Sequence, residues 1–237
     1  MTPEILVLTL TAAAIAFVHT LLGPDHYLPF VAMARARNWS VAKTLKITLI
    51  CGAGHLVGSV LLGVLGIAVG MQLASLEWFE SVRGNLAAWM LIGFGLAYLV
   101  WGLRQAWRNK PHTHWHSHDG IRHQHVHSHH HSHAHLHEPR GEQRSLAPWV
   151  IFIIFVLGPC EPLIPLLMYP AARESLLGVM MVTGVFGVVT VATMTGVVAI
   201  ALKGLQFAKF GRFERFGHAM AGGAIACCGL AVTFLGI

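Results

Sequence analysis

The sequence predicts an all-α membrane protein of about six transmembrane helices, arranged as two inverted three-helix repeats whose first helices are broken at Gly-Pro pairs. Three observations lead to this fold class. Apolar residues make up 55% of the 237 residues and charged residues only 11%, against roughly 45–50% and 25% in soluble domains. Six segments reach the roughly 20 mostly apolar residues that a membrane-spanning helix needs. A Leu-Gly-Pro motif also occurs twice, in the first and the fourth of these segments.

The six segments define the expected elements and domains. We expect membrane-spanning helices near 5–33, 45–70, 85–106, 147–170, 175–202 and 217–236. The first is longer than a single span requires, and Gly23-Pro24 interrupts it. The chain then divides into a first three-helix repeat at 1–106, a hydrophilic loop at 107–146 and a second three-helix repeat at 147–237.

The distribution of Lys and Arg predicts how the chain crosses the membrane. The loops after the first, third and fifth spans each carry at least four cations, whereas the connections after the second and fourth carry one each, Arg83 and Arg173. Because basic loops stay in the cytoplasm, we expect both termini outside it and the 107–146 loop inside, in the bacterial inner (plasma) membrane. Topology therefore accounts for the net charge of +6, and the expected partner is the lipid bilayer, with no nucleic acid.

The repeated motif predicts where the two halves meet. Residues 22–29 read Leu-Gly-Pro-Asp-His-Tyr-Leu-Pro, and residues 157–165 read Leu-Gly-Pro-Cys-Glu-Pro-Leu-Ile-Pro. With three spans in each half, the two copies cross the membrane in opposite directions. The broken helices of such inverted repeats commonly meet at a substrate site near the bilayer midplane. A chance match is the alternative, since Gly-Pro pairs are frequent in membrane helices, but the coinciding ligand-type residues favour a repeat.

Several ionisable residues lie at membrane depth, where a charged group costs about 2.5–3.5 kcal/mol. Structural hydrogen bonds would explain any one of them, whereas the group as a whole favours a metal site. The candidate ligands are His19, Asp25, His26, His55, Cys160 and Glu161. A continuous helix would separate His19 from His26 by roughly 10 Å along its axis. The Gly23-Pro24 break could bring them to one ion; otherwise they are successive positions on a path.

His55 lies between Gly54 and Gly58, a small-xxx-small pair. Glycines at this spacing let a neighbouring helix backbone approach closely, which would set His55 directly against the helix broken at Gly23-Pro24. Counted from each Gly-Pro pair, Thr190 of the second half falls at the offset of His55.

The hydrophilic loop is rich in histidine: thirteen of the seventeen histidines lie between His112 and His137. Such tracts are typical of metal binding, and neutral imidazole suits zinc, nickel, copper and iron. A purification tag and a pH sensor are the alternatives. Because the loop has no apolar periodicity, we expect it to lack regular structure without metal.

The motif His19–His26, together with the glycine-flanked His55, resembles the nickel/cobalt transporter superfamily, and most closely its UreH-like and NicO-type membrane proteins. One departure is that five residues, and not four, separate His19 from the Asp-His pair. The resemblance implies transport of Ni²⁺ or Co²⁺, with Zn²⁺ as a further candidate and uptake favoured over export. It implies no tightly bound cofactor and no enzymatic activity. A cytoplasmic metallochaperone and a second copy of the chain are candidate partners.

An alternative function rests on the second motif. Residues 158–162, Gly-Pro-Cys-Glu-Pro, are similar to the proline-flanked cysteine of the CcdA/DsbD membrane electron carriers, which have a related inverted-repeat architecture. That resemblance implies a thiol–disulfide electron conduit, an oxidoreductase. Such a conduit needs two cysteines that can approach each other, and the position matching Cys160 is Asp25. Cys51, Cys227 and Cys228 remain as candidate partners.

Overall fold

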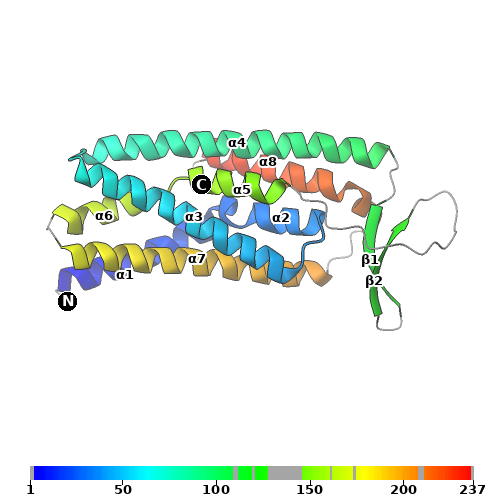
Figure 1. Ribbon diagram of the computed structural model, residues 1–237, viewed down its shortest axis with the longest axis horizontal. Coiled ribbons are helices and arrows are strands. Elements are labelled where there is room, and N and C mark those ends of the chain that lie inside the picture. The colour runs from blue at the N-terminus through cyan, green and yellow to red at the C-terminus, as the bar shows by residue number, and fades with distance from the viewer. Residues whose placement is uncertain are drawn as a thin grey trace.

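The structure is a computed structural model that describes residues 3–108, 112–118, 121–127, 146–160, 162–172, 175–207 and 211–235. The first half contains α1 (Pro3–Leu22), a 3-10 turn (Pro24–His26), α2 (Leu28–Ala36), α3 (Val41–Ala68) and α4 (Leu73–Trp107). The second half contains α5 (Ala147–Leu157), α6 (Leu163–Ala172), α7 (Leu176–Phe207), a 3-10 turn (Gly211–Phe216) and α8 (Gly217–Leu235). All these helices run along one long axis (Figure 1).

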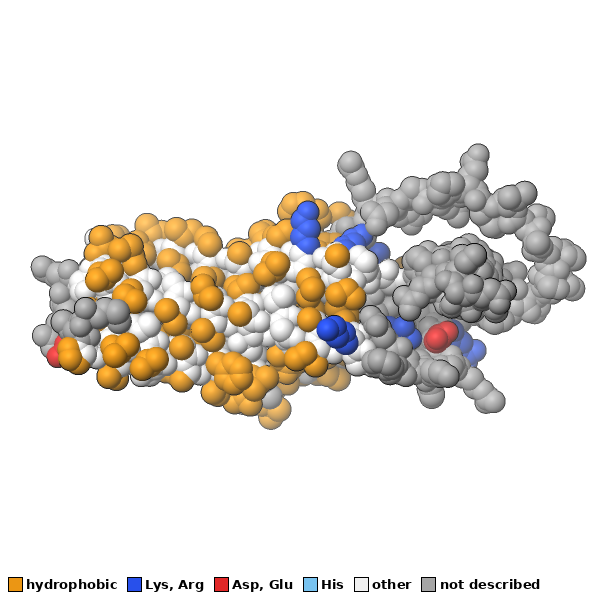
Figure 2. Space-filling view, turned by 90° about the horizontal axis from the view of Figure 1, so that it is seen from below, with side chains coloured by type: hydrophobic (Ala, Val, Ile, Leu, Met, Phe, Trp, Pro, Cys, Tyr) orange, Lys and Arg blue, Asp and Glu red, His pale blue; other side chains and the backbone are white. Residues whose placement is uncertain are grey.

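The helices have the lengths and compositions of an integral membrane protein. Among the described residues, five helices are long and apolar enough to cross a membrane: α1, α3, α4, α7 and α8. The fourth predicted span is instead built from two short helices, α5 of 11 residues and α6 of 10. Large apolar side chains cover the outer surface of the bundle, and cationic side chains gather towards one end (Figure 2). Lipid is the solvent that such a surface requires.

The third span was predicted at 85–106, and this boundary is wrong: α4 begins at Leu73 and has 35 residues. Arg83, which we expected in a connection, therefore lies in the helix, together with Glu77 and Glu80. Hydropathy alone could not place them, because charged residues in a span look like a loop until their partners are known. Glu80 is buried and paired with Arg83.

Helices α4 and α8 pack closely against each other. Cβ atoms added at Gly95 and Gly102 of α4 would meet the backbone at Ala226 and Ala219 of α8. As the residue number rises along one helix it falls along the other, so the two helices are antiparallel. Because glycine has no side chain, the two backbones can come this close, and many membrane helices associate in this way.

Part of the predicted loop at 107–146 forms regular structure. β1 (His112–His118) and β2 (Ile121–His127) form a two-stranded antiparallel sheet at one end of the molecule (Figure 1), with His112 opposite His127 and His116 opposite His123. The sequence predicted no regular structure here, because its histidines give no apolar alternation. Residues 128–145, which contain the other histidines of the tract, lie outside the described residues.

Candidate functional site at two helix breaks

The first break separates α1 from α2. Helix α1 ends at Leu22, and Pro24 opens the 3-10 turn, since proline lacks the N–H that a continuing helix needs. The His26 ring folds back over this turn. Its Nδ1 lies 3.0 Å from Asp25 Oδ1 and 3.2 Å from the Gly23 carbonyl oxygen. A Cβ atom at position 23 would lie 2.6 Å from that nitrogen. A side chain at position 23 would therefore displace the His26 ring from this position.

Three histidines meet at this break. The ring centroids of His19 and His26 lie 5.0 Å apart, and those of His26 and His55 lie 5.5 Å apart, both edge to face. His26 Nδ1 and His55 Nδ1 each face carbonyl or carboxylate oxygens, so both donate from Nδ1–H when neutral. The Nε2 atoms of all three rings are buried and make no hydrogen bond within the described residues.

The break brings the His19 and His26 rings together. Two positions seven residues apart on a continuous helix lie roughly 10 Å apart, whereas the turn at Pro24 brings the two rings into contact. Within the part of the chain that the structure describes, no group of three or more His, Cys, Asp or Glu side chains is placed to hold a metal ion.

The second break separates α5 from α6 in the other half. Helix α5 ends at Leu157, Gly158-Pro159 interrupts the chain, and α6 begins at Leu163. Cys160 lies between the two helices with 0% of its surface exposed and a free thiol. Its backbone N–H donates a hydrogen bond to Glu80 Oε2 at 3.1 Å. Glu161, which we also predicted as a ligand, lies outside the described residues.

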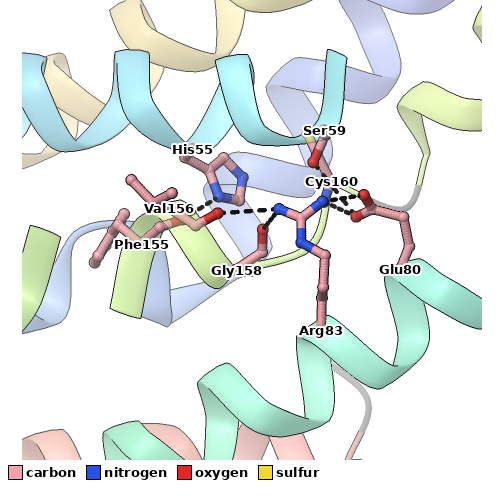
Figure 3. A network of polar contacts seen from close by, with 8 residues as sticks. All are labelled: His55, Ser59, Glu80, Arg83, Phe155, Val156, Gly158 and Cys160. Atoms are coloured by element: carbon pink, nitrogen blue, oxygen red, sulfur yellow. Dashed lines mark hydrogen bonds and ion pairs between the residues drawn. The ribbon is translucent and has the colours of Figure 1, made fainter. Parts of the chain in front are cut away.

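Two charged residues that the sequence analysis did not single out hold this break (Figure 3). Arg83 donates from Nη2 to the carbonyl oxygens of Val156 at 3.0 Å and Gly158 at 3.1 Å, and from Nη1 to Glu80. Ser59 donates to Glu80 Oε2 at 3.3 Å. An acid and a base three residues apart, as Glu80 and Arg83 are, can pair on one helix face. That spacing at the edge of an apolar segment was the signal available in the sequence.

A helix backbone does lie close to His55, but it belongs to α5, whereas we expected the helix that is broken at Gly23-Pro24. Cβ atoms at Gly54 and Gly58 of α3 would lie 2.9 Å from the Val156 side chain and 2.8 Å from the Val156 carbonyl oxygen. The α5 backbone therefore lies directly against α3. The His55 ring consequently donates from Nδ1 to the Phe155 carbonyl oxygen at 3.1 Å while it also touches the His26 ring.

The two breaks meet at one small cavity of about 30 Å³. Asp25 and His26 line it from the first break, and Gly158 and Pro159 line it from the second. A space of this size admits one or two water molecules at most. Residues of both copies of the motif therefore contribute to the lining of one cavity.

A model of one protein family, the cytochrome C biogenesis protein transmembrane region, matches residues 27–231. Comparison with curated proteins and with solved structures gives no match.

The family match overturns our assignment to the nickel/cobalt transporter superfamily, and with it the predicted transport of nickel or cobalt. The motif His19–His26 was misleading for a physical reason. Buried imidazole and carboxylate groups around a broken membrane helix look alike in sequence, whether they bind an ion or one another, and here His26 bonds to Asp25. The second motif, around Cys160, pointed to the right relatives. Since the match spans most of its length, the chain belongs to the family of the cytochrome C biogenesis protein transmembrane region.

Proposed function

We propose that this protein carries reducing equivalents across the membrane by thiol–disulfide exchange and that Cys160 is its reacting thiol. The observation that carries the proposal is the position of Cys160. A proline-flanked cysteine interrupts a membrane helix, directly after the residues that line the cavity shared by both breaks. Membership of a cytochrome C biogenesis transmembrane family supports this alternative reading of the sequence. The chain then acts as an oxidoreductase, contrary to our expectation that it is no enzyme.

An arrangement as two inverted three-helix repeats accompanies this function. Gly158 follows Gly23 by 135 positions, and one helix pairing is repeated between the halves. Helix α1 packs against α7 just as α5 packs against α3, and α3 packs against α7 at the centre. Thr190, which matches His55 by this offset, is likewise buried. Breaks related in this manner commonly form the moving parts of membrane carriers.

The reaction can proceed with one membrane thiol. The Cys160 thiolate attacks an acceptor disulfide, which forms a mixed disulfide and releases one acceptor thiolate. A thiolate of the donor then attacks Cys160 Sγ in this mixed disulfide. The attack releases the second acceptor thiolate and leaves the donor bound to Cys160. The second thiolate of the donor attacks the donor sulfur of the new mixed disulfide and regenerates the Cys160 thiolate. Two electrons and two protons thus pass from a dithiol to a disulfide, and Asp25 at the matching position takes no part in the exchange.

Because the acceptor is still bound to Cys160 when the donor attacks, Sγ must become reachable from both sides of the membrane. The thiol is enclosed in the present conformation, so a partner's sulfur reaches it only after the segments around the breaks move. By the positive-inside rule, the basic end of the bundle faces the cytoplasm of a bacterial inner membrane. The dithiol donor then lies on the cytoplasmic side and the disulfide acceptor on the other, where the chain termini also lie.

Reconstituted vesicles test the proposal. A dithiol donor is enclosed on one side, a protein disulfide is supplied on the other, and its reduction is followed with time. We expect activity from the wild type and from the variant with Cys51, Cys227 and Cys228 all replaced by alanine, and background rates from Cys160→Ser. Full activity in a well-incorporated Cys160→Ser variant would rule the proposal out.

A further inference from the structure

The break at Gly158-Pro159 exposes backbone groups that a continuous helix would satisfy internally. The last carbonyl groups of α5 and the first N–H groups of α6 have no partners within their own helices. In a membrane interior such groups must find partners elsewhere in the protein. Arg83 covers the carbonyl oxygens of Val156 and Gly158, and Glu80 covers the N–H of Cys160. Two residues of one helix turn thus hold the chain on both sides of the break.

Burial and charge make this contact a costly one to break. The side chains of Glu80 and Arg83 are 1% and 20% exposed, and they form an ion pair with each other. Removing one partner of a buried pair leaves an uncompensated charge, which is strongly destabilising. Two glycines give the pair its access to the break. A Cβ atom at Gly58 would lie 3.0 Å from Arg83 Nη2, and one at Gly84 would lie 2.7 Å from Pro159 Cγ.

We propose that Glu80 and Arg83 are positioning residues that clamp the backbone around Cys160, so that the thiol becomes reachable by a partner's sulfur only when this clamp opens. The inference rests on the proposed function, since it concerns access to the same thiol. Neither side chain reacts. Glu80 and Arg83 act through the backbone of residues 156–160, which they hold against α4 (Figure 3).

The first break is held in a different way. Its His26 ring bonds to Asp25 and Gly23, its own neighbours in the chain. The residues that match Glu80 and Arg83 by the offset of 135 are Arg215 and His218. His218 Nδ1 lies 2.8 Å from the Tyr98 hydroxyl, and Arg215 is an exposed residue with the opposite charge to Glu80. The clamp thus belongs to the break that carries the thiol.

The test is the rate at which a membrane-permeant maleimide alkylates Cys160 in native membranes, with Cys51, Cys227 and Cys228 replaced by alanine. We expect Glu80→Gln and Arg83→Gln to raise this rate by about tenfold or more, because each leaves a buried charge unpaired. Arg83→Lys keeps the charge but loses the planar fork that reaches both carbonyl oxygens, so it should raise the rate as well. The matched controls are Glu77→Gln and Arg104→Lys on the same helix, both at exposed positions, and their rates should equal that of the parent.

Wild-type alkylation rates in both Glu80→Gln and Arg83→Gln would overturn the inference. A wild-type rate in Arg83→Lys would also overturn it, since charge alone would then explain the pair. If the single variants fail to accumulate, the double variant Glu80→Gln/Arg83→Met removes both charges and gives the same expectation. Disulfide reduction in the vesicle assay separates the two proposals. Loss of activity in Cys160→Ser with unchanged alkylation in the clamp variants refutes only the clamp, whereas faster alkylation without any Cys160-dependent activity refutes only the electron carrier.

Discussion

Hydrogen bonding at single residues decides how the two breaks differ. Around the first break, His26 and His55 donate from Nδ1, and their buried Nε2 atoms make no hydrogen bond among the described residues. Around the second break, the polar groups of Glu80 and Arg83 have partners on the neighbouring backbone. The backbone on both sides of the second break, the one with the thiol, is thus bonded to charged side chains of α4.

Gly58 is the residue that lets α5 reach Arg83. We predict that Gly58→Ala lowers the free energy of unfolding in detergent by about 1–3 kcal/mol, because its Cβ atom would lie 2.8 Å from the Val156 carbonyl oxygen. A thermal or denaturant unfolding series measures the change. Gly196→Ala is the control: no atom lies within 4 Å of its added Cβ, so it should be neutral or slightly stabilising. Equal stability of the two variants would contradict the close approach of α3 and α5.

Among the elements, α4 carries two roles along its length. Its first turns hold Glu80 and Arg83 against the second break, and its later turns pack on α8 through Gly95 and Gly102. Helix α8 also has glycines in this contact, at positions 222 and 229. Cβ atoms added there would meet Leu99 and Ile92 of α4. Helix α4 therefore joins the C-terminal helix to the break that carries Cys160.

The α4–α8 contact can be tested at two neighbouring glycines. We predict that Gly95→Ala lowers the free energy of unfolding by about 1–3 kcal/mol or more, because the added methyl group meets backbone atoms of Ala226, which cannot move as a side chain would. Gly93→Ala, two residues away with nothing within 4 Å, should unfold at the wild-type midpoint or above it. Unfolding curves in one detergent give both values. A loss of stability at position 93 equal to that at 95 would show that helix packing is not the cause.

At the scale of the whole molecule, the two ends of the helix bundle differ in their content of exposed cations. The α2–α3 connection, the sheet of β1 and β2, and the end of α7 lie together at one end, whereas the start of α1 and the α3–α4 connection lie at the other (Figure 1). The exposed cations gather at the first of these ends (Figure 2). This agrees with the alternation of basic loops along the sequence.

The two ends of α4 can be used to measure the orientation of the chain in the membrane. Its 35 residues extend about 52 Å, well beyond a hydrocarbon core of about 30 Å, so the residues that flank it lie on opposite sides of the membrane. In a background with the four native cysteines replaced, we predict that a membrane-impermeant maleimide added to intact cells labels Gln72→Cys and spares Arg108→Cys. Labelling of Arg108→Cys alone would show that the chain has the opposite orientation. Labelling of both variants would show that α4 does not span the membrane.

By itself, the sequence determined the membrane-protein class, most of the spans and both breaks. These follow from local quantities: the apolar content of about 20 residues, the alternation of Lys and Arg, and proline's missing N–H. The last predicted span, at 217–236, agrees closely with α8 (Gly217–Leu235). The position of the second break also followed from Gly158-Pro159 alone.

Only the tertiary structure decided what each buried polar group binds. It brought His19 to His26 across a turn that the sequence allowed but did not require. It moved the start of α4 back to Leu73 and turned Glu80 from a loop residue into a partner of the Cys160 backbone. A buried charge is tolerated only when its partners are in place, and the Val156 carbonyl group lies 73 positions away from Arg83 along the chain. Periodicity and spacing act over a few helical turns, so no local pattern could have joined the two.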